Sequence, residues 1–224
     1  MNLMMLLEMA AGGFGDRVAV GSLNSGLTVK QIFDNAGLAA QRFRNANVEN
    51  VAMIDMASPS LPICLFGASW AGLPFVPLNY RLTNQELNSL LERISPSIAL
   101  MQPDTQERIS NASKVHPVMR DDLIASNHTE IEISTDWNMD GEDTAILLFT
   151  SGTTGEPKAA VLRQRHLVSY ILGSVDFGSH LRLSLLRLRW AMSISSIQSC
   201  PVWQSPFGLG SRIELCLSCV SFSL

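Results

Sequence analysis

The sequence has no excess of basic residues. Its 224 residues include 16 Lys and Arg against 20 Asp and Glu, which gives a formal net charge of -4. No cluster of Lys and Arg occurs before residue 182. Proteins that bind nucleic acid through its phosphates need concentrated positive charge. The charge balance therefore argues against nucleic acid as a partner.

Cysteine is also scarce. The four Cys residues are Cys64, which stands alone, and Cys200, Cys216 and Cys219 near the end of the sequence. Their number and placement do not support a disulfide framework, so we expect a reducing compartment and a cytoplasmic protein. Cys216 and Cys219 have the C-x-x-C spacing of a metal or redox site, but no second pair or neighbouring His accompanies them. We therefore predict no metal site there.

Long apolar runs are absent as well. The best candidate window, residues 61 to 78, is interrupted by Pro62, Gly67, Gly72, Pro74 and Pro77. Because a helix needs about 20 apolar residues to cross a bilayer, we expect no membrane span. The opening MNLMMLLEMAAGG has no basic region and contains Glu8, which disfavours a signal peptide. It predicts an amphipathic first helix instead.

Apolar residues make up 46% of the sequence, enough for a core in one large domain or two small ones. Short β-rich segments alternate with segments of helical periodicity. We expect strands at residues 18–20, 51–56, 75–78, 97–101, 144–150 and 159–162. Helices of this length between strands indicate parallel crossovers. The predicted fold class is therefore α/β, with a mostly parallel sheet covered by helices on both faces.

Three of the expected helices have recognisable boundaries. Thr28 is a predicted N-cap, and Thr83 with Glu86 forms a capping box at the start of a later helix. Residues 60–71 predict a packed helix that ends at Gly72. These signals are local, so they locate the helices without reference to the rest of the fold.

Two connecting regions are more polar. Residues 103–143 predict surface connections around one weak strand and a short helix. Asn79, Tyr80 and Arg81 are expected to close a turn ahead of the helix that Thr83 caps. We interpret them as turn residues, not as substrate ligands.

The stretch LLFTSGTTGEPKAAVL, residues 147 to 162, lies between two expected strands. Gly152 and Gly155 permit backbone geometries in which consecutive N–H groups turn toward one anion. Lys158 supplies a positive charge, and Pro157 stiffens its approach. Hydroxyl donors come from Thr150, Ser151, Thr153 and Thr154. Such a loop suits the phosphates of a nucleotide.

A simpler interpretation of this stretch is a Gly/Thr loop that joins two strands of a hairpin, because short glycine-rich motifs often match by chance. The loop is not a Walker A motif. Lys158 follows Pro157 where that motif has Gly, and Ala159 stands where it has Ser or Thr. P-loop kinase or GTPase chemistry is therefore excluded.

LLFTSGTTGEPK, residues 147 to 158, resembles the phosphate-binding signature of the adenylate-forming enzymes, which include acyl-CoA and aryl-CoA synthetases, peptide-synthetase adenylation domains and luciferases. Residues 67 to 87, GASWAGLPFVPLNYRLTNQEL, are similar to a preceding segment of this family, in the form typical of acyl-CoA synthetases. LEMAAGGFGDRVAV and LTVKQIFDNAGLAAQRF resemble its N-terminal helix and first crossover. The resemblance extends from about residue 3 to about residue 178.

The resemblance implies an AMP-forming acyl-CoA ligase that uses ATP, Mg²⁺ and CoA. A carboxylic acid, of the fatty-acid type, attacks the α-phosphate of ATP, and CoA then displaces AMP to form a thioester. The resemblance places Thr150, Ser151, Gly152, Thr153, Thr154, Gly155 and Lys158 around the ATP phosphates. Donors already aimed at the phosphates would stabilise the developing charge at little reorganisation cost.

Later motifs of the family are absent from the sequence. We find no aromatic motif for adenine, no Glu for magnesium, no Asp for ribose and no catalytic Lys of a C-terminal domain. We therefore assign no catalytic residue and no metal ligand. The alternative to a ligase is an inactive fragment that acts as a nucleotide- or protein-binding module. His166, on the helix expected after residue 162, is interpreted as a surface residue.

Residues 179–224 differ in composition from residues 1–178. The segment holds one acidic residue, Glu214, and 24 of its 46 residues are Ser, Leu or Arg. Each of these three amino acids has six codons, so we favour a frameshifted, retained-intron or prematurely ended tail over a divergent interaction tail. The predicted organisation is a partial adenylate-forming domain at 1–178 and an atypical tail at 179–224.

Overall fold

The structure is a computed structural model that describes residues 1–22, 24, 26–56, 58–109, 114–124, 136–150 and 157–174. Helices and strands alternate along these residues, as expected. In chain order the elements are α1 (Leu3–Phe14), β1 (Val18–Val20), β2 (Leu27–Thr28), α2 (Val29–Asn45), β3 (Asn50–Ile54), α3 (Ser60–Ala71), β4 (Phe75–Pro77), α4 (Asn84–Arg93), β5 (Ser97–Met101), α5 (Pro103–Gln106), η1 (Glu107–Ile109), β6 (Val115–Met119), α6 (Asp121–Ile124), β7 (Thr144–Thr150), β8 (Lys158–Arg163) and α7 (Gln164–Ser174).

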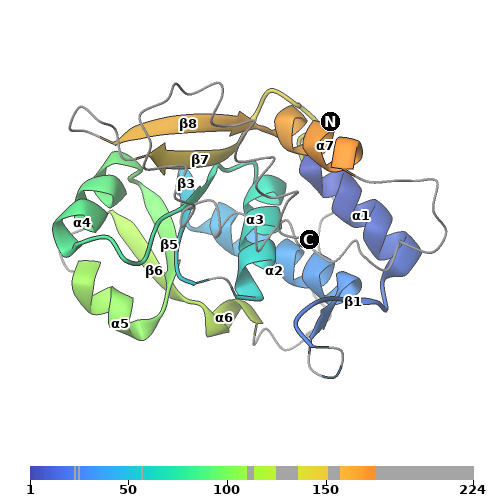
Figure 1. Ribbon diagram of the computed structural model, residues 1–224, viewed down its shortest axis with the longest axis horizontal. Helices are drawn as coiled ribbons and strands as arrows, with labels where there is room; N and C mark the ends of the chain where they lie inside the picture. The colour runs from blue at the N-terminus through green and yellow to red at the C-terminus, as the bar shows by residue number, and fades with distance from the viewer. Residues whose placement is uncertain are drawn as a thin grey trace.

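The main sheet has six strands in the order β6-β5-β3-β4-β7-β8. All neighbours in it are parallel except β7 and β8, which form an antiparallel pair. A separate antiparallel pair joins β1 and β2. Figure 1 shows α4 and α5 toward the left of the molecule, α3 near the middle, and α1 and α7 toward the right. The predicted fold class, a mostly parallel α/β sheet covered on both faces, is confirmed.

Alternate residues of the central strands pack into two separate cores. In β3, Val51 and Met53 belong to the larger core, which also contains buried residues of α1, α2 and α3. Ala52 and Ile54 belong to the smaller core, which contains buried residues of α4. Side chains alternate across a strand, so an apolar strand must be covered on both faces. This requirement explains why β3 and β5 are apolar at almost every position.

The predicted helix boundaries are confirmed where local signals marked them. Thr28 caps α2, and Gln31 completes a capping box that we did not predict. Thr83 and Glu86 form the expected capping box of α4. Gly72 ends α3 with φ 76°, a left-handed conformation that favours glycine. Each signal lies within a few residues of the boundary it sets.

A buried amide fixes α7 against the start of the chain. Gln164 is 2% exposed; its Oε1 accepts a hydrogen bond from the Leu3 amide (3.1 Å), and its Nε2 donates to Ser69 Oγ (3.3 Å). Asn2 Nδ2 donates to the Asn138 carbonyl at 2.7 Å. A buried polar side chain is costly unless it is paired. These bonds therefore join α1, α3 and α7 in one arrangement.

The polar region 103–143 contains more regular structure than we predicted. Its described residues form β6, α5, η1 and α6, where one weak strand and one short helix were expected. β6 contains Pro117 and has two exposed residues, so its sequence lacks the apolar alternation of a buried strand. Among the residues that the structure describes, no helix is long and apolar enough to cross a bilayer.

The close packing of α3 on α2 depends on Gly67. A Cβ at this position would lie 2.9 Å from Ala39 Cβ and 3.1 Å from the Ala36 carbonyl oxygen. We predict that Gly67→Ala lowers the free energy of unfolding by about 1–3 kcal/mol through overpacking, as measured by urea denaturation.

Gly12 provides the matched control, because it lies in α1 and a Cβ there would meet nothing within 4 Å. Gly12→Ala should raise the free energy of unfolding by about 0.5–1 kcal/mol, since Ala is the better helix former. If both substitutions change stability in the same direction, the close approach at Gly67 is not a constraint.

Candidate functional site

The two ends of the glycine-rich loop lie on paired strands. Thr150, the last residue of β7, is opposite Lys158, the first residue of β8. Thr150 Oγ1 donates a hydrogen bond to the Lys158 carbonyl at 3.3 Å. The strands predicted at 144–150 and 159–162 are therefore confirmed, and they form a hairpin.

The structure brings together only two of the seven predicted phosphate-binding residues, Thr150 and Lys158. The other five lie outside the described residues, and their role stays a prediction: Ser151, Gly152, Thr153, Thr154 and Gly155.

The hairpin end lies at the carboxyl edge of the sheet. β7 is parallel to β4, with Phe75 opposite Ile146, so the chain leaves β7 at the same edge at which it leaves β4. Open α/β sheets bind their ligands outside the carboxyl ends of the strands. The position of the hairpin end therefore agrees with the predicted binding role.

Lys158 is exposed and is available for an anionic ligand. None of the ion pairs found among the described residues includes its ammonium group. Alternation along β8 places the side chain of Lys158 on the same face as Ala160, and alternation along β7 places Thr150 on the face of Leu148. Both of these neighbours pack on the larger core, so the cation and the hydroxyl share one face of the hairpin.

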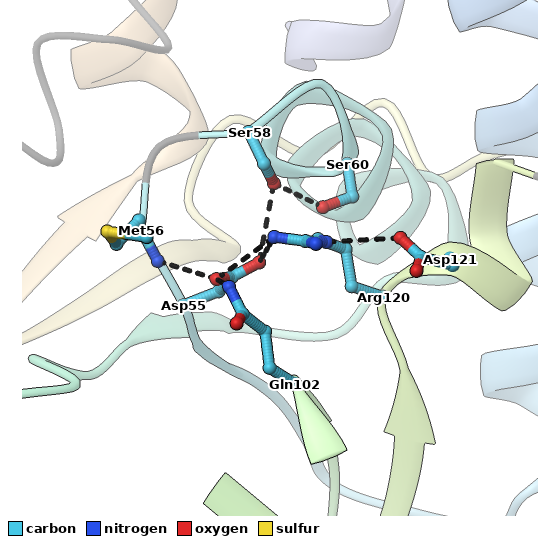
Figure 2. A network of polar contacts seen from close by, with 7 residues as sticks. All are labelled: Asp55, Met56, Ser58, Ser60, Gln102, Arg120 and Asp121. Carbon is cyan, nitrogen blue, oxygen red and sulfur yellow. Dashed lines mark hydrogen bonds and ion pairs between the residues drawn. The ribbon is translucent and has the colours of Figure 1, made fainter. Parts of the chain in front are cut away.

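A second polar group at the carboxyl edge was not predicted. Asp55 follows β3, and its side chain is 1% exposed. Its Oδ2 lies 3.2 Å from Arg120 Nη1, and its Oδ1 accepts a hydrogen bond from Gln102 Nε2 at 2.7 Å. Figure 2 shows these side chains converging from the ends of β3, β5 and β6, with Ser58 and Ser60 at the start of α3.

This network satisfies its own charges. The Met56 amide also donates to Asp55 Oδ1 at 2.7 Å, and Ser58 Oγ donates to Oδ2 at 3.5 Å. Burial lowers the pKa of Arg120, but Asp121 and Asp55 raise it by more, so the guanidinium stays charged. A carboxylate with four partners is suited to holding strand ends together. We therefore interpret the network as an anchor of the edge.

Sequence reasoning could have found part of this anchor. Gln102 directly follows the strand predicted at 97–101, whereas Asp55 lies inside the one predicted at 51–56. Polar residues at the ends of parallel strands are a usable signal. Arg120 follows β6, which sequence reasoning did not locate.

His166 and the turn before α4 have the local roles that we predicted. His166 is exposed, and its Nδ1 accepts a hydrogen bond from the Arg163 amide at 3.2 Å, at the start of α7. The Arg81 amide donates to Asn79 Oδ1 at 2.9 Å, which closes the expected turn.

A metal site is not found in the described part of the chain. No group of three or more His, Cys, Asp or Glu side chains there could hold an ion. Because Mg²⁺ is usually held by one or two carboxylates together with substrate phosphates, the Mg²⁺ implied by the resemblance stays a prediction. Burial raises the pKa of the Cys64 thiol, which keeps it protonated inside the larger core.

The model of the AMP-binding enzyme family matches residues 7–206. The matched range continues beyond residue 178, the end of the resemblance expected from the sequence. Residues 179–224 lie outside the described residues, and their origin stays a prediction.

Similar proteins include ligases with different acceptors. The chain is 24% identical over 208 residues to a D-alanine–D-alanyl carrier protein ligase of Staphylococcus haemolyticus. This match covers 92% of the chain and 38% of that relative. The fold is similar to Mycobacterium tuberculosis fatty acyl CoA synthetase (TM-score 0.64, 18% identity, 78% of this chain, 38% of that chain). It is also similar to ATP-bound MatB from Rhodopseudomonas palustris (TM-score 0.61, 23% identity, 77% of this chain, 37% of that chain). The chain spans less than half the length of each.

If the network anchors the edge, removing one of the two carboxylates that contact Arg120 should cost much more unfolding free energy than removing the other. Asp55→Ala leaves Gln102 and the guanidinium without their buried partner, so we expect a loss of about 2–4 kcal/mol in the free energy of unfolding, measured by denaturant titration.

Asp121→Ala is the control, because that carboxylate also lies 3.2 Å from Arg120 but is 82% exposed. Its removal should cost about 1 kcal/mol or less. Equal losses for the two variants would contradict the anchoring role of Asp55.

Proposed function

The chain belongs to the AMP-binding enzyme family, and on that premise we propose that it binds the phosphates of ATP at the β7–β8 hairpin and activates a carboxylic acid. The observation that carries this proposal is the pairing of Thr150 with Lys158 at the carboxyl edge of the sheet. An ammonium group and a hydroxyl there can stabilise negative charge on a polyphosphate. The similar fold of ATP-bound MatB supports a nucleotide as the ligand.

The proposed reaction has two steps. The substrate carboxylate attacks the α-phosphate of ATP, which gives an acyl-adenylate and releases pyrophosphate. A thiol then attacks the acyl carbon, forms a thioester and releases AMP. In the first step Lys158 would stabilise charge on the departing pyrophosphate, while Thr150 and the residues up to Gly155 would orient the phosphates.

We propose CoA as the thiol acceptor and a fatty acid as the carboxylic acid. The similar fold of a fatty acyl CoA synthetase supports this choice. A carrier-protein thiol is the second candidate acceptor, because the D-alanyl carrier protein ligase covers 92% of the chain. Both acceptors attack the same acyl-adenylate, so the choice does not alter the role proposed for the hairpin.

A second candidate function is binding without ligation. The exposed Lys158 and the Thr150 hydroxyl can hold phosphate without any further residue, so they support this alternative as well. Under this alternative the hairpin still holds a nucleotide, but no acyl-adenylate forms.

Removing the hairpin cation tests the binding role. Lys158→Ala should weaken ATP binding by about tenfold or more, because a charge-assisted contact to phosphate is lost. The measurement is isothermal titration calorimetry on the 224-residue chain. Lys114→Ala is the control, since Lys114 is also exposed but precedes β6, at the amino edge of the sheet. Equal ATP affinity in the two variants would contradict the proposed site.

Pyrophosphate exchange separates ligation from binding alone. With ATP and a panel of carboxylic acids, ligation predicts acid-dependent exchange above that of the Lys158→Ala variant, whereas binding alone predicts no such difference. Acid-dependent exchange well above that variant would show that this chain forms an acyl-adenylate by itself. It would also rule out the binding-only alternative.

Saturable binding of CoA tests the choice of acceptor. In the presence of a non-hydrolysable acyl-adenylate analogue, CoA should bind the chain, as measured by calorimetry, and a carrier protein with its phosphopantetheine arm should not. Binding of the carrier protein alone would favour the second acceptor.

A further inference from the structure

Arg93, at the C-terminal end of α4, contacts the hairpin from outside the phosphate-binding motif. Its Nη1 donates a hydrogen bond to the Pro157 carbonyl at 2.6 Å, across 64 residues of sequence. Its guanidinium carbon lies 5.4 Å from the centroid of the Phe149 ring. One side chain therefore contacts both arms of the hairpin: Phe149, just before Thr150, and Pro157, just before Lys158.

The register makes these two contacts a bridge across the hairpin end. Phe149 is opposite Ala159, and Thr150 is opposite Lys158, the residue that follows Pro157. Arg93 is the described side chain that bonds to the backbone immediately before Lys158. It thus limits where the hairpin cation can lie relative to α4.

Arg93 approaches the hairpin on the face opposite to Lys158. Phe149 packs with the smaller core, beside α4, whereas alternation along β7 and β8 places Thr150 and Lys158 on the face of the larger core. A ligand held by Thr150 and Lys158 would therefore lie across the backbone from Arg93. The guanidinium can influence that ligand through the Pro157 peptide, not by direct contact.

The base of the Arg93 side chain is firmly held. α4 begins with the Thr83–Glu86 capping box and buries Leu87, Leu90 and Leu91 in the smaller core. Arginine presents a planar group that can donate a hydrogen bond and stack on an aromatic ring at the same time. A fixed helix and a two-point contact together define the position of the hairpin end.

We propose that Arg93 is a positioning residue of the phosphate site: it holds the Pro157–Lys158 backbone in the conformation that presents Lys158 to the ATP phosphates. This inference rests on the proposed function of the hairpin. Its physical basis is preorganisation, because a hairpin end that is already ordered loses less conformational entropy when the ligand binds. The expected effect therefore concerns polyphosphate affinity, while the contribution to stability of an exposed arginine is small.

The test compares nucleotides that differ only in their phosphates. Arg93→Ala should weaken ATP binding roughly fivefold, the effect of one net hydrogen bond, and leave AMP binding unchanged, because AMP lacks the phosphates assigned to Lys158. Arg93→Lys should recover most of the loss, since lysine can still donate to the Pro157 carbonyl and place a cation over Phe149. Affinities are measured by calorimetry on the full chain, and thermal unfolding is recorded for each variant.

Arg17→Ala is the matched control. Arg17 is also exposed and also lies over an aromatic ring, 4.8 Å from the centroid of Phe14, but it follows α1. The Arg17→Ala substitution removes the same charge and the same kind of contact, but not at the hairpin, so it should leave the affinity for ATP unchanged. An equal loss in this variant would show a general effect of net charge and would overturn the proposal.

Failure of this inference is distinguishable from failure of the proposed function. If Lys158→Ala weakens ATP binding and Arg93→Ala does not, the phosphate site stands and the role of Arg93 is overturned. If neither substitution changes ATP affinity, the phosphate site itself is wrong. Parallel losses of ATP affinity, AMP affinity and thermal stability in Arg93→Ala would also overturn the proposal, because they indicate a structural role.

Discussion

The structure depends on the parallel pairing of β3 with β4 on one side and with β5 on the other. Parallel strands need a crossover for every pair, so this pairing forces helices onto the two faces of the sheet. It also places the ends of these strands at one edge, where Asp55 and Gln102 follow β3 and β5. The two apolar cores and the polar edge are therefore consequences of the same strand arrangement.

The chain turns in opposite directions at β3, because β4 is added on one side and β5 on the other. Doubly wound sheets commonly use the crevice at such a reversal for ligands. Here the position is filled by Asp55, Gln102 and Arg120, whose polar groups satisfy one another. The candidate ligand site lies instead at the β7–β8 hairpin, where Lys158 has no acidic partner among the described ion pairs.

Sequence reasoning located elements whose signals are local and missed contacts that join distant segments. The Thr83–Glu86 capping box could be predicted because its partners are three residues apart, and the strand at 97–101 because four of its five residues are apolar. The Asp55–Arg120 pair spans 65 residues, and no periodicity reports which polar residues will meet after the sheet forms.

The candidate site was predicted to a similar extent and for the same reason. The motif identified Thr150 and Lys158, and the hairpin given as the simpler interpretation of this stretch is present as the antiparallel pair of β7 and β8. Arg93 lies outside the motif and could not be connected with it, because its contact with Pro157 exists only once α4 packs beside β7.

The position of Lys158 depends on β7 and β8 being the one antiparallel pair in the described main sheet. A parallel neighbour of β7 would begin at the opposite edge and would carry its first residues away from the carboxyl ends. Because β8 runs back, its first residue, Lys158, starts where β7 ends and lies opposite Thr150 at the carboxyl edge of the sheet. The other face of the hairpin carries Phe149, which Arg93 of α4 contacts. The proposed phosphate contacts and the Arg93 contact therefore lie on opposite faces of the hairpin, and both depend on the direction of β8.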